Sequence, residues 1–176
     1  ALTREVDPTS WSRALDRSRY PAFNLLLGEG SDLYYATEET EGLVHVAPGV
    51  HALSNARLDV SWPKAEHAKR GLQALLEAPS LDVEAAFAIL AARDRAADEA
   101  LPRTGVPLEL ERALSPAFLA MDAYGTRAST VVAMARDGSI RFAERSWGPG
   151  GVLASAVDVV LTPDDAVERA GATRSA

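Results

Sequence analysis

Two neighbouring residues in the last third of the chain constrain its fold more than any other feature. Asp137 and Gly138 stand between two apolar, β-branched runs, residues 126–136 and 139–147. A two-residue hairpin turn needs positive φ at both central positions, and Asp-Gly is among the pairs that adopt it most readily. The sequence therefore predicts an antiparallel β-hairpin over residues 126–147.

The same turn predicts a register for the hairpin. If Arg136 faces Ser139 across a two-residue turn, every later pair follows, and Val131 faces Glu144. One face of the ribbon would then carry Arg127, Ser129, Val131, Phe142 and Glu144. Residues 131–135 are apolar on both sides of the pleat, which predicts a strand covered on both faces, with helices outside and sheets inside.

Upstream, the spacing of apolar residues predicts both helices and strands, and so an α+β fold. A short helix begins at Asp7-Pro8. Residues 23–27 and 33–35 flank a glycine-containing turn and are predicted to form a hairpin. Residues 49–53 are a third predicted strand.

Two amphipathic helices are predicted in the middle of the chain. The first spans residues 61–78, with Asp59 or Ser61 as its cap, and Ser80 caps the second. Residues 93–111 contain Pro102, Gly105 and Pro107, and they are expected to form a polar connection on the surface.

Charge and the absence of cysteine exclude several partners and chemistries. The formal net charge is −7, with 18 Lys and Arg among 25 Asp and Glu, so no nucleic-acid partner is expected. The chain contains no cysteine, which excludes a disulfide, a cysteine-ligated metal and a thiol nucleophile within these residues. No apolar run reaches the ~18–20 residues that a bilayer requires, so we expect no transmembrane segment and a soluble, cytoplasmic protein.

No metal or cofactor is predicted. His45, His51 and His67 do not stand at helical ligand spacing. The Gly28-Glu29-Gly30 turn precedes a predicted strand, whereas a dinucleotide-binding glycine motif precedes a helix.

Five strings of residues carry a resemblance to a known family. They are Phe23-Asn24-Leu25-Leu26, Leu53-Ser54-Asn55-Ala56, Trp62-Pro63-Lys64, Leu101-Pro102 with Thr104-Gly105-Val106-Pro107-Leu108-Glu109, and Tyr124-Gly125-Thr126-Arg127 with Ser129-Thr130-Val131. In this order and spacing the chain resembles the NRDE family, also known as the transport and Golgi organisation family.

The resemblance implies an N-terminal nucleophile hydrolase-like fold, a layered αββα sandwich with two stacked sheets between helical layers. The family's N-terminal cysteine and its Asn-Arg-Asp-Glu motif have no counterpart here, so we expect the chain to lack the first strands and the candidate nucleophile. Residues 1–147 would then be one N-terminally incomplete domain of the family. Residues 148–176 would be a tail, in which Thr162-Pro163 could begin one short helix.

By motif, the resemblance also implies two supporting catalytic residues. Asn55 matches an asparagine that helps to form an oxyanion hole in related cysteine amidohydrolases, and Arg127 matches an arginine that supports the nucleophile. Both residues also have structural explanations. An asparagine at a strand end often tolerates a left-handed turn, and Arg127 could pair with a structural acid such as Glu144.

Three further residues are candidates for contact with a ligand. Asn24 is predicted to be buried between apolar neighbours, either as a hydrogen-bonding strut between strands or as part of a pocket. Tyr124 could line a cavity, although aromatic residues on strands more often belong to the core. Ser129 lies at the start of the hairpin on the Arg127 face, and no nearby Gly-x-Ser-x-Gly motif marks it as a nucleophile.

Two functions of different class follow from these residues. One is binding or trafficking of haem or an acyl lipid in an apolar cavity, which the family's eukaryotic members suggest and which needs no nucleophile. The other is amide or ester hydrolysis by a complete protein whose cysteine nucleophile lies upstream of this chain. For the chain as printed, binding of a small apolar ligand is the better supported of the two.

Overall fold

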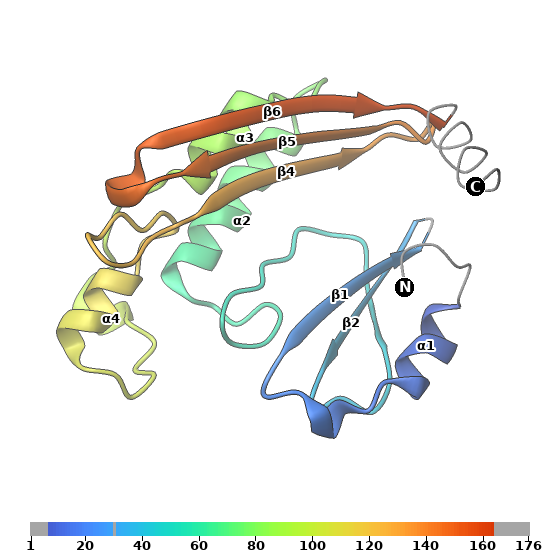
Figure 1. The fold of residues 1–176 in the computed structure, drawn as a ribbon, viewed down its shortest axis with the longest axis horizontal. Helices are drawn as coiled ribbons and strands as arrows, with labels where there is room; N and C mark the ends of the chain where they lie inside the picture. The colour runs from blue at the N-terminus through green and yellow to red at the C-terminus, as the bar shows by residue number, and fades with distance from the viewer. Residues whose placement is uncertain (1–6, 30, 164–176) are drawn as a thin grey trace, which may run out of the picture. The chain divides into compact units, whose positions relative to one another are not determined.

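The computed structural model describes residues 7–29 and 31–163. The chain divides into two compact units, Ala1–Ser61 and Trp62–Ala176 (Figure 1). Each unit holds one three-stranded antiparallel sheet, and helices accompany both. The α+β class is therefore confirmed, while the layered arrangement implied by the family remains a prediction.

Unit 1, Ala1–Ser61, is built on the hairpin predicted near its middle. Its elements are α1 (Pro8–Ala14), the 3-10 turn η1 (Arg17–Arg19), β1 (Asn24–Glu29), β2 (Asp32–Thr37) and β3 (Val44–Val46). The strands pair in the order β1-β2-β3. Leu26 lies opposite Tyr35, as an antiparallel hairpin of β1 and β2 requires.

The third strand of unit 1 is not where the sequence predicted it. It is β3, whereas residues 49–53 have no regular structure. The backbone N–H of Ala52 donates to the carboxylate of Asp59 at 3.0 Å, and the carbonyl of Ala52 accepts from the Asp59 N–H at 2.8 Å. A loop contact therefore satisfies the backbone groups that a strand would have paired.

The side chain of Arg17 ties the helical segment of unit 1 to its sheet. Its guanidinium donates to the carbonyls of Thr37 at 2.7 Å and Gly42 at 3.0 Å, and to the hydroxyl of Ser12 at 3.1 Å. The planar guanidinium has five N–H donors in a fixed geometry, so one side chain can join three segments.

Two of the helices of unit 2, Trp62–Ala176, lie where the sequence predicted them, but their caps differ from the prediction, and a further helix was not predicted. The helices are α2 (Pro63–Leu76), α3 (Val83–Leu90) and α4 (Leu108–Leu114), with the 3-10 turn η2 (Asp98–Ala100). Trp62 precedes α2 without a capping side-chain bond. Asp82, rather than Ser80, caps α3, because its carboxylate accepts from the backbone N–H groups of Glu84 and Ala85.

Residues 93–111 are more ordered than a surface connection. They contain η2 and the first residues of α4, and both Leu101 and Glu111 are buried. Pro107 precedes α4, where the fixed φ of proline favours a helix start. Most of the segment is exposed, as expected of a surface connection, while Leu101 and Glu111 anchor it to the rest of the unit.

The sheet of unit 2 has one strand more than the predicted hairpin. Its strands are β4 (Ala128–Met134), β5 (Ile140–Trp147) and β6 (Leu153–Leu161), and the 3-10 turn η3 (Pro149–Gly151) joins the last two. β6 falls in the segment expected to be a tail, and it pairs with β5 along nearly its whole length. The helix expected after Thr162 lies outside the described residues.

The hairpin is confirmed, but its register differs from the prediction by one residue. Val131 faces Ala143, not Glu144. The turn holds three residues instead of two: the Ala135 N–H donates to the Ser139 carbonyl at 2.8 Å, and Gly138 has a φ of 84°. Three-residue loops of this kind end in a residue with positive φ, which glycine adopts without strain.

The one-residue shift changes which side chains of β5 share a face with those of β4. Ser129 and Val131 lie beside Arg145 and Ala143, while Phe142 and Glu144 lie on the opposite face with Thr130 and Val132. The predicted grouping of Ser129 and Val131 with Phe142 and Glu144 was therefore wrong. A slip of one residue in a strand moves every side chain to the other face.

The core of unit 2 forms where α3 packs on this sheet (Figure 1). Val83 and Phe87 of α3 lie against Ala143 of β5, which is 1% exposed. The Arg145 guanidinium lies 4.1 Å from the centre of the Phe87 ring, and it binds both carboxylate oxygens of Glu84 at 2.6 Å. A cation over an aromatic face adds electrostatic attraction to the apolar packing.

Among the described residues of unit 2, only one face of this sheet is covered. Val132 and Met134, on the face opposite α3, are 57% and 69% exposed. The cover on both faces that the apolar pattern predicted is not provided by these residues.

Crossing a bilayer would take a long apolar helix, and the described part of the chain contains none.

Replacement of Phe87 by alanine should destabilise the protein strongly. Phe87→Ala removes the largest side chain of the α3–sheet contact, and buried Phe→Ala changes cost about 3–5 kcal/mol of unfolding free energy. Urea unfolding would measure the change. Met134→Ala removes a mostly exposed side chain from the same sheet and should change stability by no more than about 0.5 kcal/mol. Equal effects of the two substitutions would contradict this account of the core.

Candidate functional site

A pocket of about 450 Å³ in unit 1 brings together both asparagines of the chain. Asn24 begins β1 and Asn55 lies in the loop after β3, so the two are far apart in sequence. Phe23 and Val60 contribute apolar wall, and charged residues line the pocket as well. Two residues predicted separately as candidates therefore share one cavity of a size that suits a small ligand.

Hydrogen bonds hold Asn24 firmly at the wall of this pocket. Its amide Nδ2 donates to the Ala56 carbonyl at 3.0 Å, and its Oδ1 accepts from the Tyr35 hydroxyl. The same hydroxyl accepts from the Leu58 N–H at 3.3 Å. Asn24 is exposed, not buried as predicted, but these bonds make it the strut between β1, β2 and the Asn55 loop.

Asn55 differs from Asn24, because its side chain is exposed and makes no hydrogen bond to any described residue. Among those residues, the non-glycine positions with positive φ are Asp59 and Arg103. Asn55 is therefore not placed there by a left-handed turn. Its amide N–H groups are available to a carbonyl or carboxylate oxygen in the pocket.

The charged residues of this pocket do not form an acid–base pair. Glu38 accepts from the Phe23 N–H at 3.0 Å, and this bond is the main cause that lowers the pKa of its carboxyl. Arg57 forms an ion pair with Glu39. A carboxylate with a lowered pKa is a weak general base at neutral pH, so Glu38 is a poor candidate for proton transfer.

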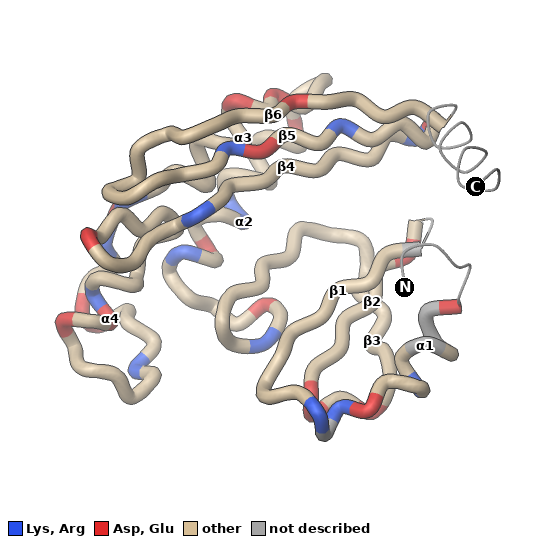
Figure 2. The backbone as a smooth tube through the Cα atoms, in the orientation of Figure 1, with Lys and Arg blue, Asp and Glu red and all other residues tan. Residues whose placement is uncertain are grey.

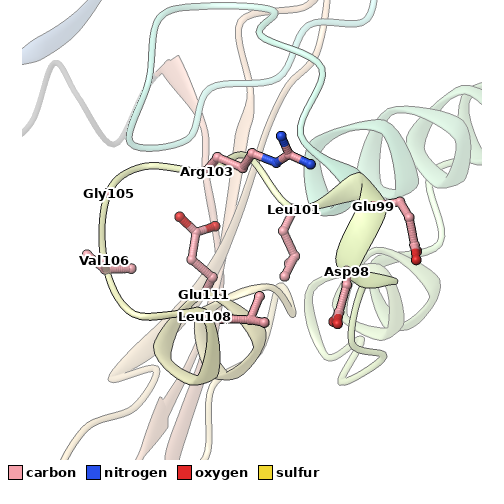
Figure 3. Close-up of a pocket in the computed structure, with 8 residues that line it drawn as sticks. All are labelled: Asp98, Glu99, Leu101, Arg103, Gly105, Val106, Leu108 and Glu111. Carbon is pink, nitrogen blue, oxygen red and sulfur yellow. The ribbon is translucent and has the colours of Figure 1, made fainter.

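A second pocket, of about 520 Å³, lies in unit 2 around the Thr104–Glu109 string (Figure 3). Leu101, Val106 and Leu108 supply its apolar wall. Figure 3 shows the Glu111 carboxylate pointing into the loop that runs from Arg103 through Gly105, while Asp98 and Glu99 point away from that loop.

Glu111 holds this loop in place. It is 6% exposed, and its carboxylate accepts from both the backbone N–H and the hydroxyl of Thr104, the latter at 2.7 Å. The hydroxyl bond is the main cause that lowers the pKa of Glu111. Arg103, next to Thr104, has a φ of 54°, so the bonds of Glu111 fix a turn that a non-glycine residue rarely adopts.

The other three predicted site residues belong to unit 2, and neither its Glu111 pocket nor the Asn24–Asn55 pocket includes them. Ser129 is buried, and its hydroxyl accepts from the Trp147 indole N–H at 3.1 Å. Tyr124 is 62% exposed in a turn closed by the Met121 N–H and the Tyr124 carbonyl.

Arg127 is exposed just before β4, and no described residue forms an ion pair with it. Glu144, its suggested structural partner, accepts instead from the Thr130 hydroxyl at 2.7 Å. The structural explanation for Arg127 therefore has no support, and its catalytic role remains a prediction.

The sequence did not single out Glu38, Arg57 or Glu111 as candidates. Arg57 directly follows one family string and Glu111 stands two residues beyond another, a weak signal that could have been followed. Glu38 stands outside the five strings, and only the fold reveals that it receives a backbone bond from Phe23.

The fold and these pockets define an α+β protein with cavities lined in part by loop residues. A family model described as "Transport and Golgi organisation 2" matches residues 2–149. The chain therefore belongs to the transport and Golgi organisation 2 family, which confirms the resemblance drawn from the five strings.

Curated relatives agree with this assignment. Over 161 residues the chain is 30% identical to the "Transport and Golgi organization protein 2 homolog" of Bos taurus and 26% identical to the protein of the same name of Homo sapiens. Each match covers 82% of this chain and 58% of the relative. The chain thus spans a little over half the length of the relatives it matches.

The ionisation of Glu111 should make stability depend on pH. Its folded pKa is lowered below the ordinary value of 4.5, so the ionised carboxylate stabilises the fold above that pH, and the contribution is lost as the pH falls through the folded pKa. Glu111→Gln should lower the melting temperature at neutral pH, and its difference from wild type should shrink in acid. Thermal melts between neutral and acidic pH would test this. Glu99→Gln, at an exposed carboxylate of the same pocket, should have little effect at neutral pH, and an equally large effect would contradict the assignment.

Proposed function

We propose that this chain binds a small, partly apolar molecule of the acyl-lipid class in the Asn24–Asn55 pocket of unit 1. The observation that carries the proposal is the free amide of Asn55 beside a rigidly held Asn24 in one cavity. In this arrangement Asn55 donates to a carbonyl or carboxylate oxygen of the ligand. The apolar part of the ligand lies against Phe23 and Val60.

Haem fits the same pocket less well than an acyl lipid. The residues that line it include no histidine, methionine, cysteine or tyrosine, the side chains that usually hold haem iron. Haem would therefore depend on its ring and its propionates, with Arg57 and Asn55 as the groups that hold the propionates. An acyl carbonyl needs only the amide, which is why we place the acyl lipid first.

The names of the relatives describe transport and Golgi organization and not a defined chemical reaction, which agrees with a role in carrying a ligand. Both are called transport and Golgi organization protein 2 homologs. We propose a corresponding role for this chain, in which a bound acyl lipid is carried and protected from water, in the cytoplasm. The absence of a suitable general base among the lining residues supports binding as the activity of this pocket.

A second candidate is hydrolysis of an amide or ester by a longer protein that contains this chain. The observation in its favour is again Asn55, since a free amide N–H is what an oxyanion hole needs. The nucleophile would be a cysteine outside these residues, and Arg127 would support its thiolate. A longer protein with no cysteine exposed at its N-terminus would rule out this candidate.

Introduction of a negative charge at Asn55 should weaken ligand binding. Asn55→Asp replaces the donor with an acceptor that repels a carboxylate or carbonyl oxygen, and the loss of such a bond should weaken affinity roughly tenfold. Calorimetric titration of the full chain with a fatty acyl-CoA, and separately with haem, would measure it. Gln73→Glu makes the same chemical change at an exposed position of α2 and serves as the matched control.

Two outcomes would contradict the proposal. If neither ligand binds saturably to the wild-type chain, the pocket does not handle this class of molecule. If both variants bind as wild type does, Asn55 does not contact the ligand. Tighter binding of haem than of acyl-CoA, with the same dependence on Asn55, would reverse the preference between the two ligands.

A further inference from the structure

A third pocket, in unit 2, gathers basic side chains although the chain as a whole is acidic. Its volume is about 180 Å³, and Lys64, His67, Arg70 and Arg95 all line it. The formal net charge of the chain is −7. Figure 2 shows basic and acidic positions interspersed along the described chain. The cavity is lined by Lys64, Arg70 and Arg95 but by only one carboxylate, Asp94, so it is more basic than the chain as a whole.

Two segments bring these residues together. Lys64, His67 and Arg70 follow one another at three-residue steps along the first half of α2, which places successive side chains on neighbouring positions of the helix surface. Arg95 comes from the segment after α3 and supplies the other wall. The sequence analysis did not connect these segments, because nothing in the spacing indicates that residue 95 returns to the start of α2.

The wall opposite α2 is fixed by Ser115. Its hydroxyl accepts from the Ala96 N–H at 3.0 Å and donates to the Arg112 carbonyl at 2.9 Å. These bonds hold the segment that carries Arg95 against the end of α4. The cavity is therefore a built feature of unit 2.

The cations of this pocket are only partly balanced, since Asp94 is the one carboxylate among its lining residues. Lys64 is half-buried, and desolvation lowers the pKa of its ammonium group. Its Nζ donates to the Leu114 carbonyl at 3.1 Å, which uses one of three N–H groups. No described residue forms an ion pair with Lys64, Arg70 or Arg95. A partly desolvated cation gains most from an anion placed beside it.

We propose that this pocket binds a small oxyanion of two negative charges, namely phosphate, either as the free ion or as the terminal group of a phosphorylated molecule. The volume corresponds to roughly six water molecules, below the ~300 Å³ at which pockets for whole organic ligands begin. Arg70 and Arg95 offer planar N–H pairs that match phosphate oxygens, and Lys64 adds a point charge. This inference is independent of the acyl-lipid pocket, which belongs to unit 1.

Calorimetry with inorganic phosphate tests the proposal directly. Titrations of the full chain at constant ionic strength, set with sodium chloride, should give a saturable signal for one site. The double variant Arg70→Gln/Arg95→Gln should bind at least about tenfold more weakly, since each arginine provides charge-assisted bonds. The double variant Arg13→Gln/Arg136→Gln removes the same charge at two exposed arginines outside the pocket, and it should bind as wild type does.

The source of the phosphate group is decided by a second titration, with glycerol 3-phosphate. Equal or tighter binding than phosphate identifies a phosphorylated molecule as the ligand, and markedly weaker binding identifies the free ion. Absence of a saturable signal for both compounds would overturn the proposal, as would equal weakening in the two double variants, because that result reports only net charge. Far-UV circular dichroism confirms folding, and the single variant Arg95→Gln replaces the double variant if folding is lost.

Discussion

The packing of α3 on the β4–β5 face is the contact on which unit 2 depends. Phe87 can lie against this face only because Ala143 offers a small side chain opposite the ring. Arg145 of β5 lies over the face of the Phe87 ring and is bound by Glu84 of α3. In the predicted register, Phe142 and Glu144 would have taken these positions. A second bulky ring and a carboxylate would have met the helix, at a cost in overpacking and in burial of charge.

The pockets rest on a different principle from the core. Each includes loop residues whose backbone groups are satisfied by a few side chains, Asn24 and Asp59 in unit 1 and Glu111 and Ser115 in unit 2. Such bonds fix the loop without filling the space beside it. Surface loops can therefore carry cavities while the sheets retain dense packing. The free amide of Asn55 and the unpaired cations near α2 are both consequences of this arrangement.

Much of the secondary structure was predictable, because local chemistry decides it. The hairpin around Asp137-Gly138 and the helices α2 and α3 were each found where the sequence placed them. The features that the sequence predicted wrongly share a cause. The positions of β3 and β6 and the caps of α2 and α3 depend on which of several suitable residues finds a hydrogen-bonding partner in the fold. Ser80 and Asp82 are equally suitable caps by residue type, but only Asp82 stands where its carboxylate reaches the free N–H groups of α3.

By itself, the sequence determined the class of the fold and the family, and it named Asn24 and Asn55 as separate candidates, because each of these depends on short stretches of sequence. Only the tertiary structure decided that Asn24 and Asn55 share that pocket, that Ser129 serves the Trp147 indole and that Arg95 joins the cations of α2. Turn residues constrain backbone angles nearby, but they leave a choice of two or three residues in the loop between strands. That choice shifts the register by one position and is settled by which side chains fit against the helix.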